Sequence, residues 1–309
     1  MKIFLNIEKI NIHEQGIIAT LFFPKNIKNA PGVIVVPGSD GAVPESISEL
    51  IASNGYVVLA LKYFGADNLP EKLSNISLEY FYNAIQYFKK QSQVNKNKVA
   101  LLGYSRGGEL VLLFSAMYPQ EISAVIAYTP PHLVYGDFSP NENAAWSFKG
   151  LPIPFMPNLS YEDILKATKD GHLPFHRGTL NDPLEATPNF LYAMKMFYKN
   201  IDSASIPVEK ILCPILILTG EDDKIWPATI SGNLIIKRLD DNGSNIIRKH
   251  LSFSNAGHEL YLSPHQPSTD LPFQFGTSYM LLGGTSEGNA SAKKESWQEV
   301  FNFLKNFLA

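Results

Sequence analysis

Short apolar runs of strand length alternate with amphipathic stretches along most of this chain, and this alternation limits the possible fold more than any other feature. The runs are continuously apolar, which is typical of parallel strands in a sheet that is covered on both faces. Between them, residues 46–54 and 78–91 carry apolar side chains at helical spacing. The pattern predicts a doubly wound α/β domain with a mostly parallel sheet. The predicted strands are residues 32–36, 56–61, 99–102, 124–127 and 215–218.

The two ends of the chain complete this predicted sheet. Residues 16–22 are expected to form an antiparallel edge strand, and residues 246–253 the last strand. Residues 297–308 have apolar side chains on one helical face, so we expect a C-terminal helix that closes the sheet. That face consists of Trp297, Val300, Phe301, Leu304 and Leu308.

The alternation is interrupted once, at about residues 131–207, where prolines, aromatic residues and short helical patterns replace clear strands. A stretch this long inside a compact domain is expected to carry its own structure or a function. Ligands of open α/β sheets bind beyond the carboxyl ends of the strands. We therefore predict that this insertion forms a cap over that edge, within a single domain that spans residues 1–309.

Composition excludes several classes of protein. Hydrophobic residues make up 45% of the 309 residues and the net charge is −3, which argues against a disordered chain and against a nucleic-acid-binding protein. Cys213 is the only cysteine, so no disulfide framework is possible, and its apolar neighbours predict a buried thiol. The sequence shows neither a secretory signal at Met1–Leu5 nor an apolar run long enough to span a membrane. We expect a soluble, cytoplasmic protein, and the sequence predicts no oligomeric state.

The strongest motif is Gly103-Tyr104-Ser105-Arg106-Gly107, which directly follows a predicted strand and opens a predicted helix. This strand–turn–helix context is the one required of a nucleophile elbow, so we expect an α/β-hydrolase fold with Ser105 as nucleophile. The elbow exposes the serine hydroxyl above the sheet, and the helix N-terminus favours developing negative charge.

A serine nucleophile needs a base and an acid that orients the base, and in this fold they follow in the order acid, then histidine. Glu221, Asp222 and Asp223 stand in the turn after the strand 215–218, and His258 follows the last strand. Asp223 has the usual offset from Gly220, so we prefer it to Asp222 as the acid.

Other histidines are weaker candidates. His250 lies inside a predicted strand, and His13, His132 and His265 are isolated. His172 and His176 have the spacing of a metal pair on a helix, but Pro174 stands between them and no cluster of further ligands accompanies them. We therefore expect no metal in the reaction.

The oxyanion of an acyl-transfer reaction needs two backbone donors. The amide of Arg106, the residue after the nucleophile, is one expected donor. The second donor is expected in the glycine-flanked loop 37–41, and we predict that it is the Ser39 amide.

These motifs and several others together resemble one family, the acyl-CoA thioesterases and bile acid-CoA:amino acid N-acyltransferases, in their C-terminal α/β-hydrolase domain. The resemblance extends from about residue 16 to the C-terminus, including the insertion. The motifs that carry it include Gly38-Ser39-Asp40-Gly41, Ser105-Arg106-Gly107-Gly108, Asp182-Pro183-Leu184-Glu185, Gly220-Glu221-Asp222-Asp223, Ala256-Gly257-His258 and Gly283-Gly284-Thr285.

The resemblance implies hydrolysis of acyl-CoA thioesters, or acyl transfer from them to an amino acid. The transferases of the family typically have cysteine as nucleophile and its thioesterases serine, so Ser105 favours hydrolysis. Two differences stand out. Many members have lysine where this chain has Arg106, and the chain is expected to lack the N-terminal β-sandwich domain of the animal members.

The expected function is thus a serine hydrolase that cleaves acyl thioesters, most of all acyl-CoA, through Ser105, His258 and Asp223, without a cofactor. Three alternatives stay open: a general carboxylesterase or dienelactone-hydrolase-like enzyme, an N-acyltransferase, and a catalytically silent binding protein. A CoA substrate would need cations for its phosphates. Candidate cations in the insertion are Lys149, Lys166, Lys169 and Arg177.

Overall fold

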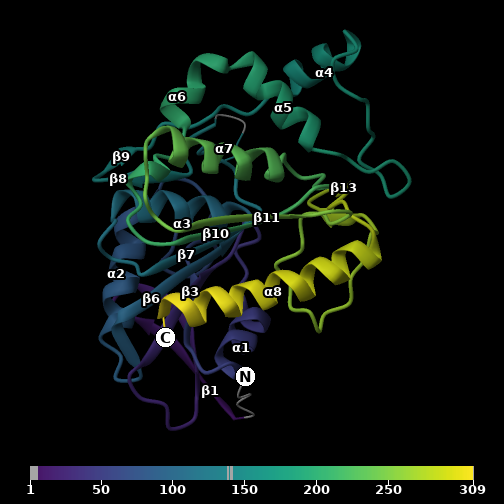
Figure 1. Cartoon of the computed structure of the whole chain (residues 1–309). Coiled ribbons are helices and arrows are strands. Elements are labelled where there is room, and N and C mark those ends of the chain that lie inside the picture. Colours follow the sequence, from purple (N-terminus) through teal and green to yellow (C-terminus); the bar gives the residue numbers. More distant parts are fainter. Residues whose placement is uncertain (1–5, 138, 140–141, 309) are drawn as a thin grey trace.

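The computed structural model describes residues 6–137, 139 and 142–308, so part of the segment on which the signal-peptide expectation rests, Met1–Leu5, lies outside the described residues. An eight-stranded sheet forms the centre in the order β1-β2-β4-β3-β6-β7-β10-β11 (Figure 1). Six strands are parallel, while β2 runs antiparallel to both β1 and β4. The strands are β1 (Ile7–Glu14), β2 (Ile17–Pro24), β3 (Ala30–Val36), β4 (Val57–Lys62), β6 (Val94–Tyr104), β7 (Ala124–Tyr128), β10 (Ile215–Gly220) and β11 (Arg248–Phe253).

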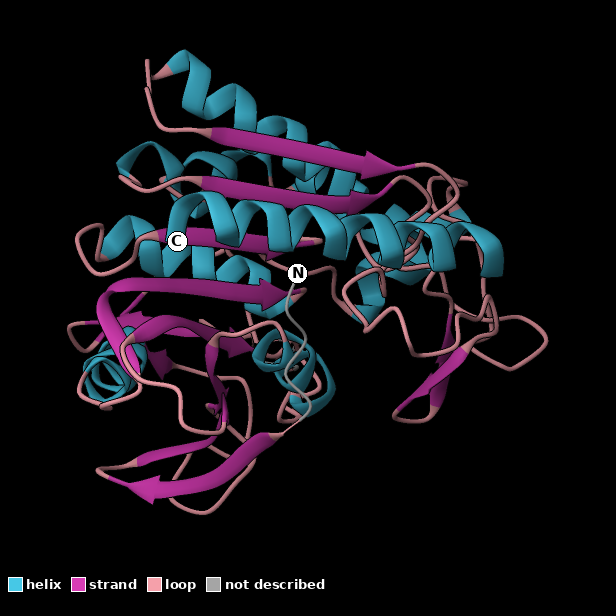
Figure 2. Ribbon diagram, turned by 60° about the horizontal axis from the view of Figure 1, so that its bottom comes forward, coloured by secondary structure: helices cyan, strands magenta, loops and turns pink. Residues whose placement is uncertain are grey.

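Helices cover both faces of this sheet (Figures 1 and 2). Successive side chains of a strand point to opposite faces, so Ile34 of β3 joins the core under α2 and α3 while Val33 joins the core under α1 and α8. This explains the continuously apolar runs and confirms the predicted doubly wound, mostly parallel α/β fold. The covering helices are α1 (Glu45–Ser53), α2 (Leu78–Lys89), α3 (Arg106–Met117), α7 (Ala228–Asp241) and α8 (Ser286–Leu308).

The predictions at the two ends of the chain are partly wrong. Residues 16–22 belong to β2, which is not the edge strand, because β1 pairs along its outer side. β1 was missed because most of its side chains are exposed and polar, as expected at a sheet edge, and it contains no apolar run. The last helix is longer than predicted, since α8 begins at Ser286 and its first turns are largely polar.

The segment from 131 to 207, here called the insertion segment, contains more regular structure than the sequence predicts. Contrary to expectation it contains two short strands, β8 (Trp146–Phe148) and β9 (Leu151–Pro152), and β8 pairs with β5 (Ile76–Ser77). Two-residue and three-residue strands are too short to give a periodic signal. Its helices are α4 (Tyr161–Lys169), α5 (Thr187–Met196), η1 (Tyr198–Asn200) and α6 (Ile201–Ala204), and η2 (Val208–Lys210) follows the segment. Helices α4, α5 and α6 lie together at the top of Figure 1.

Two further observations complete the fold. β12 (Phe273–Phe275) and β13 (Ser278–Met280) form a separate hairpin between β11 and α8. Among the helices of the described residues, none is both long and apolar enough to cross a membrane.

Candidate active site

Ser105 stands at a sharp turn between β6, which ends at Tyr104, and α3, which begins at Arg106. Its backbone angles are φ 56° and ψ −123°, in a region that non-glycine residues rarely adopt. The Ser105 amide donates to the carbonyl oxygen of Tyr128 at the end of the neighbouring strand β7, at 3.0 Å. The turn is therefore strained and held in place by the adjacent strand, as expected of a nucleophile elbow.

Three glycines around this serine are needed because other backbone comes very close. A Cβ built on Gly103 would overlap the Gly107 carbonyl, and one built on Gly107 would lie 2.5 Å from the carbonyl oxygens of Val36 and Pro37. A Cβ on Gly108 would lie 2.8 Å from the carbonyl oxygen of Tyr128. Close packing of strand, turn and helix thus explains why glycine occupies each of these positions.

The loop 37–41 lies directly beside the serine. A Cβ built on Gly38 would lie 3.0 Å from the Cβ of Ser105. The next amide, that of Ser39, makes no hydrogen bond to any residue that the structure describes. The Ser39 amide is therefore available as a donor for a negatively charged ligand oxygen. Arg106, the other predicted donor, provides the first amide of α3.

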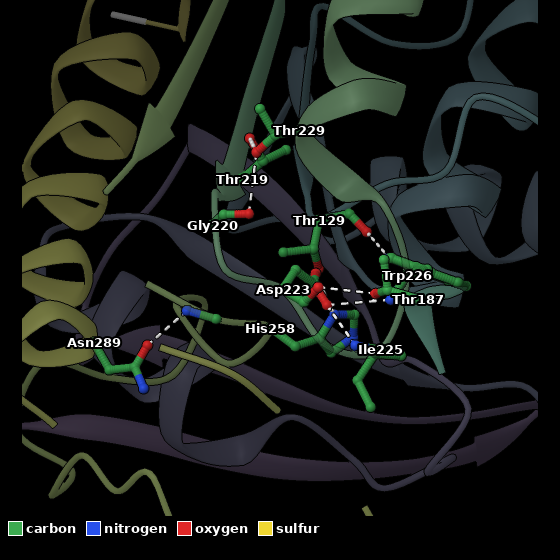
Figure 3. Close-up of polar contacts among 11 residues, drawn as sticks. Thr129, Thr187, Thr219, Gly220, Asp223, Ile225, Trp226, Thr229, His258 and Asn289 are labelled. Carbon is green, nitrogen blue, oxygen red and sulfur yellow. Dashed lines mark hydrogen bonds and ion pairs between the residues drawn. The ribbon is translucent and has the colours of Figure 1, made fainter. Parts of the chain in front are cut away.

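His258 and Asp223 are in direct contact. His258 Nδ1 lies 2.8 Å from Asp223 Oδ2, and the two side chains are 7% and 2% exposed (Figure 3). The other oxygen, Asp223 Oδ1, accepts hydrogen bonds from the amides of Ile225 (2.8 Å) and Trp226 (3.2 Å). Because a carboxylate only accepts, Nδ1 of His258 donates in this contact, and in the neutral imidazole Nε2 is then the acceptor.

The two neighbouring carboxylates point elsewhere. Asp222 accepts from the Gly284 amide at 2.9 Å and pairs with Lys224 at 3.0 Å. Glu221 accepts from the hydroxyls of Ser252 and Ser254. Only Asp223 of the three therefore contacts His258.

Residues that the sequence did not single out hold the histidine loop. Asn289 of α8 accepts from the Gly257 amide at 2.8 Å (Figure 3). Asn289 also donates to the Gly283 carbonyl at 3.1 Å. The His258 amide in turn donates to the Leu282 carbonyl at 2.8 Å. Long-range contacts of this kind leave no local pattern, although Gly283 belongs to one of the quoted motifs.

Trp226 joins the acid, the histidine and β7. Its indole lies edge-to-face with the His258 ring at 5.6 Å between centroids, and its Nε1 donates to the Thr129 carbonyl at 2.9 Å. β6, β7 and β10 are neighbouring parallel strands, so Ser105, Thr129 and Asp223 follow strand ends at the same edge of the sheet. Within the described part of the chain, no hydrogen bond joins the Ser105 hydroxyl to His258. Such bonds are often long in ligand-free enzymes.

Arg106 is also a buried side chain with several contacts. Its Nη1 lies 2.8 Å from Glu109 Oε2, and its Nη2 donates to the carbonyls of Tyr135 and Gly136. Glu109 Oε1 accepts from Trp146 Nε1 at 2.6 Å. Burial raises the pKa of Glu109 to about 7, and the Arg106 guanidinium opposes this rise. The first turn of α3 is thereby connected to the insertion segment.

The remaining sequence candidates lie outside this arrangement. His176 pairs with Asp182, and His172 stacks on Tyr192. The described residues contain no cluster of three or more histidine, cysteine, aspartate or glutamate side chains suited to a metal. Cys213 is buried as predicted, and burial raises the pKa of its thiol to about 12. The four cations proposed for a CoA substrate are all exposed: Lys149, Lys166, Lys169 and Arg177.

The strand order, together with the sharp strand–turn–helix at Ser105, is that of the α/β-hydrolase fold. Solved structures agree: α/β hydrolase GrgF from Penicillium sp. sh18 has a TM-score of 0.57 at 17% identity, covering 98% of this chain and 99% of that one. An esterase from Pyrobaculum calidifontis has a TM-score of 0.54 at 16% identity, covering 99% and 87%.

Within that fold the chain belongs to the family described as BAAT / acyl-CoA thioester hydrolase C terminal, which matches residues 76–309. The resemblance seen in the sequence is thus confirmed. Acyl-coenzyme A thioesterase 6 of Mus musculus is 28% identical over 311 residues, covering 98% of this chain and 66% of the relative. Acyl-coenzyme A thioesterase 1 of Homo sapiens is 29% identical, covering 94% and 63%. The chain therefore spans less than two thirds of the length of these relatives.

Proposed function

We propose that this protein is a serine hydrolase that cleaves acyl thioesters, with acyl-CoA as the favoured substrate class. The observation that carries the proposal is the Asp223–His258 contact, at the same sheet edge as the strained Ser105 turn. Family membership and the acyl-CoA thioesterase names of the relatives support the substrate class. The insertion segment is proposed to act as a cap over this edge, since Thr187 of α5 donates to the Asp223 carbonyl at 2.8 Å.

In the proposed mechanism His258 Nε2 takes the proton from the Ser105 hydroxyl as its oxygen attacks the thioester carbonyl carbon. Asp223 holds the imidazole and stabilises the imidazolium that forms. The Ser39 and Arg106 amides donate to the oxyanion. Collapse of the tetrahedral intermediate breaks the carbon–sulfur bond, and the protonated His258 gives its proton to the leaving thiolate. Water activated by His258 then releases the acid, so this mechanism needs neither a cofactor nor a metal.

The test of this assignment is Ser105→Ala, with Ser115→Ala as matched control. Ser115 is a buried serine of the same helix whose hydroxyl has no partner among the described residues. Ser105→Ala should lower turnover of acyl-CoA by at least about a thousandfold and abolish labelling by a fluorophosphonate. Ser115→Ala should keep both. Substantial turnover by a folded Ser105→Ala protein would overturn the assignment.

The same assay separates the neighbouring functions. Faster cleavage of a p-nitrophenyl ester than of the acyl-CoA with the same chain would identify a general carboxylesterase. An acyl conjugate formed after addition of glycine or taurine would identify an acyltransferase. Ser105 is expected to be needed in all three cases, so the substrate comparison tests the substrate class alone.

A further inference from the structure

The loop 37–41, which lies beside Ser105, is held from its far side by the end of β4. The Tyr63 hydroxyl donates to the carbonyl oxygen of Pro37 at 2.9 Å, with the Gly38 carbonyl oxygen at 3.3 Å as a second acceptor. The Lys62 ammonium donates to the Gly41 carbonyl oxygen at 3.1 Å. These are side-chain contacts to the backbone of the loop, and they join elements more than 20 residues apart in sequence.

The position of the Tyr63 hydroxyl is fixed by its surroundings. The side chain is 1% exposed, and its ring packs against those of Phe64, Phe81 and Trp146 at centroid distances of 5.1, 5.3 and 5.8 Å. Burial raises the pKa of Tyr63 well above its ordinary value, so the hydroxyl keeps its proton and acts as a donor. A rigid donor of this kind restricts the rotation of the peptide units that it binds.

Because a peptide unit is planar, restricting its carbonyl group also fixes the direction of its N–H group. The described residues contain no cis peptide bond, so the C=O and N–H of each peptide unit point in opposite directions. The Gly38 carbonyl and the Ser39 amide belong to one unit. The Gly38 oxygen is bound by Tyr63 and, at 3.3 Å, by the Gly41 amide. The Ser39 N–H therefore points away from the buried tyrosine.

The surroundings of Pro37 show how closely this loop is fitted to the nucleophile turn. The Pro37 carbonyl oxygen that accepts from Tyr63 would lie 2.5 Å from a Cβ on Gly107. It is thus enclosed between the tyrosine hydroxyl and the first turn of α3. Rotation of this peptide unit is therefore restricted from both sides.

We propose that Tyr63 is a positioning residue, assisted by Lys62, that orients the Ser39 amide toward the oxyanion of the reaction. The proposal rests on the proposed hydrolase function. Tyr63 itself touches neither the substrate nor the reacting atoms. It acts through the carbonyl side of the peptide units, and its effect is expressed mainly when the carbonyl oxygen of the substrate becomes an oxyanion.

The test is Tyr63→Phe, with Tyr87→Phe as matched control. Tyr87 of α2 is also buried, and its hydroxyl donates to Glu14 of the edge strand β1, so it takes no part in the candidate site. Loss of a whole oxyanion donor costs roughly 100-fold to 1000-fold in kcat, so loss of its orientation by Tyr63→Phe should lower kcat by about 10-fold to 100-fold. KM should stay within about twofold, because the ground state gains little from the donor.

The inhibition constant of a trifluoromethyl ketone distinguishes an effect on the oxyanion donor from a merely structural effect. The ketone binds as a tetrahedral adduct, formed by addition of the Ser105 oxygen to its carbonyl carbon. Its inhibition constant should rise in Tyr63→Phe by the same factor as kcat falls. Tyr87→Phe should lower the melting temperature without either change.

The outcomes separate the two proposals. The role of Tyr63 would be overturned if Tyr63→Phe folds and has the same kcat and inhibition constant as Tyr87→Phe. If Tyr63→Phe does not fold, Lys62→Met replaces it, since that half-buried side chain holds the same loop and should show the same change in the same direction. Unchanged kcat and inhibition constant in Lys62→Met would then overturn the proposal. Absence of Ser105-dependent hydrolysis in the wild type would instead overturn the proposed function.

Discussion

At the scale of single residues, the two oxygens of Asp223 have different partners. Oδ2 faces His258, while Oδ1 receives two backbone amides from the turn that follows. The second set of contacts fixes the rotation of the carboxylate, so the first oxygen can hold the imidazole in one orientation. Asp222, one residue away, has its own amide and lysine partners. This difference makes the pair a direct test of the acid.

We expect Asp223→Asn to lower kcat by about a thousandfold to ten-thousandfold while the protein stays folded. The amides of Ile225 and Trp226 would select the oxygen of the new side chain, which leaves its NH₂ group facing His258. His258 would then carry its proton on Nε2 and could not accept one from Ser105. The measurement is kcat together with the melting temperature. Asp222→Asn is the control, and an equal loss in that variant would contradict the assignment.

At the scale of elements, the first turn of α3 connects Ser105 with the insertion segment. Its backbone follows the serine, and its buried side chains Arg106 and Glu109 contact the insertion segment. A buried ion pair stabilises little by itself, but removal of one partner leaves the other without compensation. The contact of Glu109 with both Arg106 and Trp146 therefore couples α3 to β8.

We expect Glu109→Gln to lower the free energy of unfolding by about 3 kcal/mol at pH 8.5. At that pH the wild-type carboxylate is ionised, because burial raises its pKa only to about 7. Glutamine has one acceptor oxygen where Arg106 and Trp146 need two, so an N–H group would face another donor. Urea unfolding measures the difference. Glu121→Gln, which removes one charge from a pair with Lys89 whose two side chains are 22% and 18% exposed, should cost less than about 1 kcal/mol.

The elements also explain why part of the fold and of the candidate site could be predicted from the sequence. Strands buried on both faces leave continuous apolar runs, and the elbow leaves a motif because its glycines avoid backbone at close range. β1 leaves no run because it is an exposed edge. The contacts of Tyr63, Trp226 and Asn289 join segments that are distant in sequence, so only the fold reveals these contacts. The assignment of Asp223 depended on an offset in a turn, which the sequence alone left open.

At the scale of the whole molecule, the insertion segment contacts the rest of the fold at separate places along its length. Near its start, His132 Nδ1 lies 3.0 Å from the Ser231 hydroxyl of α7. Farther on, Thr187 contacts the loop that contains Asp223, and the amide of Ile206 donates to the His132 carbonyl at 3.0 Å. His132 thus stands where the two ends of the segment meet the core. Charging this histidine should therefore destabilise the whole fold.

Burial lowers the pKa of His132 from 6.5 to about 4, and this shift determines how stability depends on pH. Between these two pH values the unfolded chain binds more protons than the folded one, so acid favours unfolding. The stabilising contribution of His132 is complete above about pH 6.5 and is lost as the pH falls toward 4. The loss at pH 5 amounts to about 2 kcal/mol. His132→Asn removes the titrating group, so its free energy of unfolding should fall less between pH 7 and pH 5 than that of the wild type. Denaturant unfolding at several pH values measures this, with His13→Asn on exposed β1 as a control that should follow the wild type. Parallel pH profiles for His132→Asn and wild type would show that His132 titrates alike in the folded and unfolded chains.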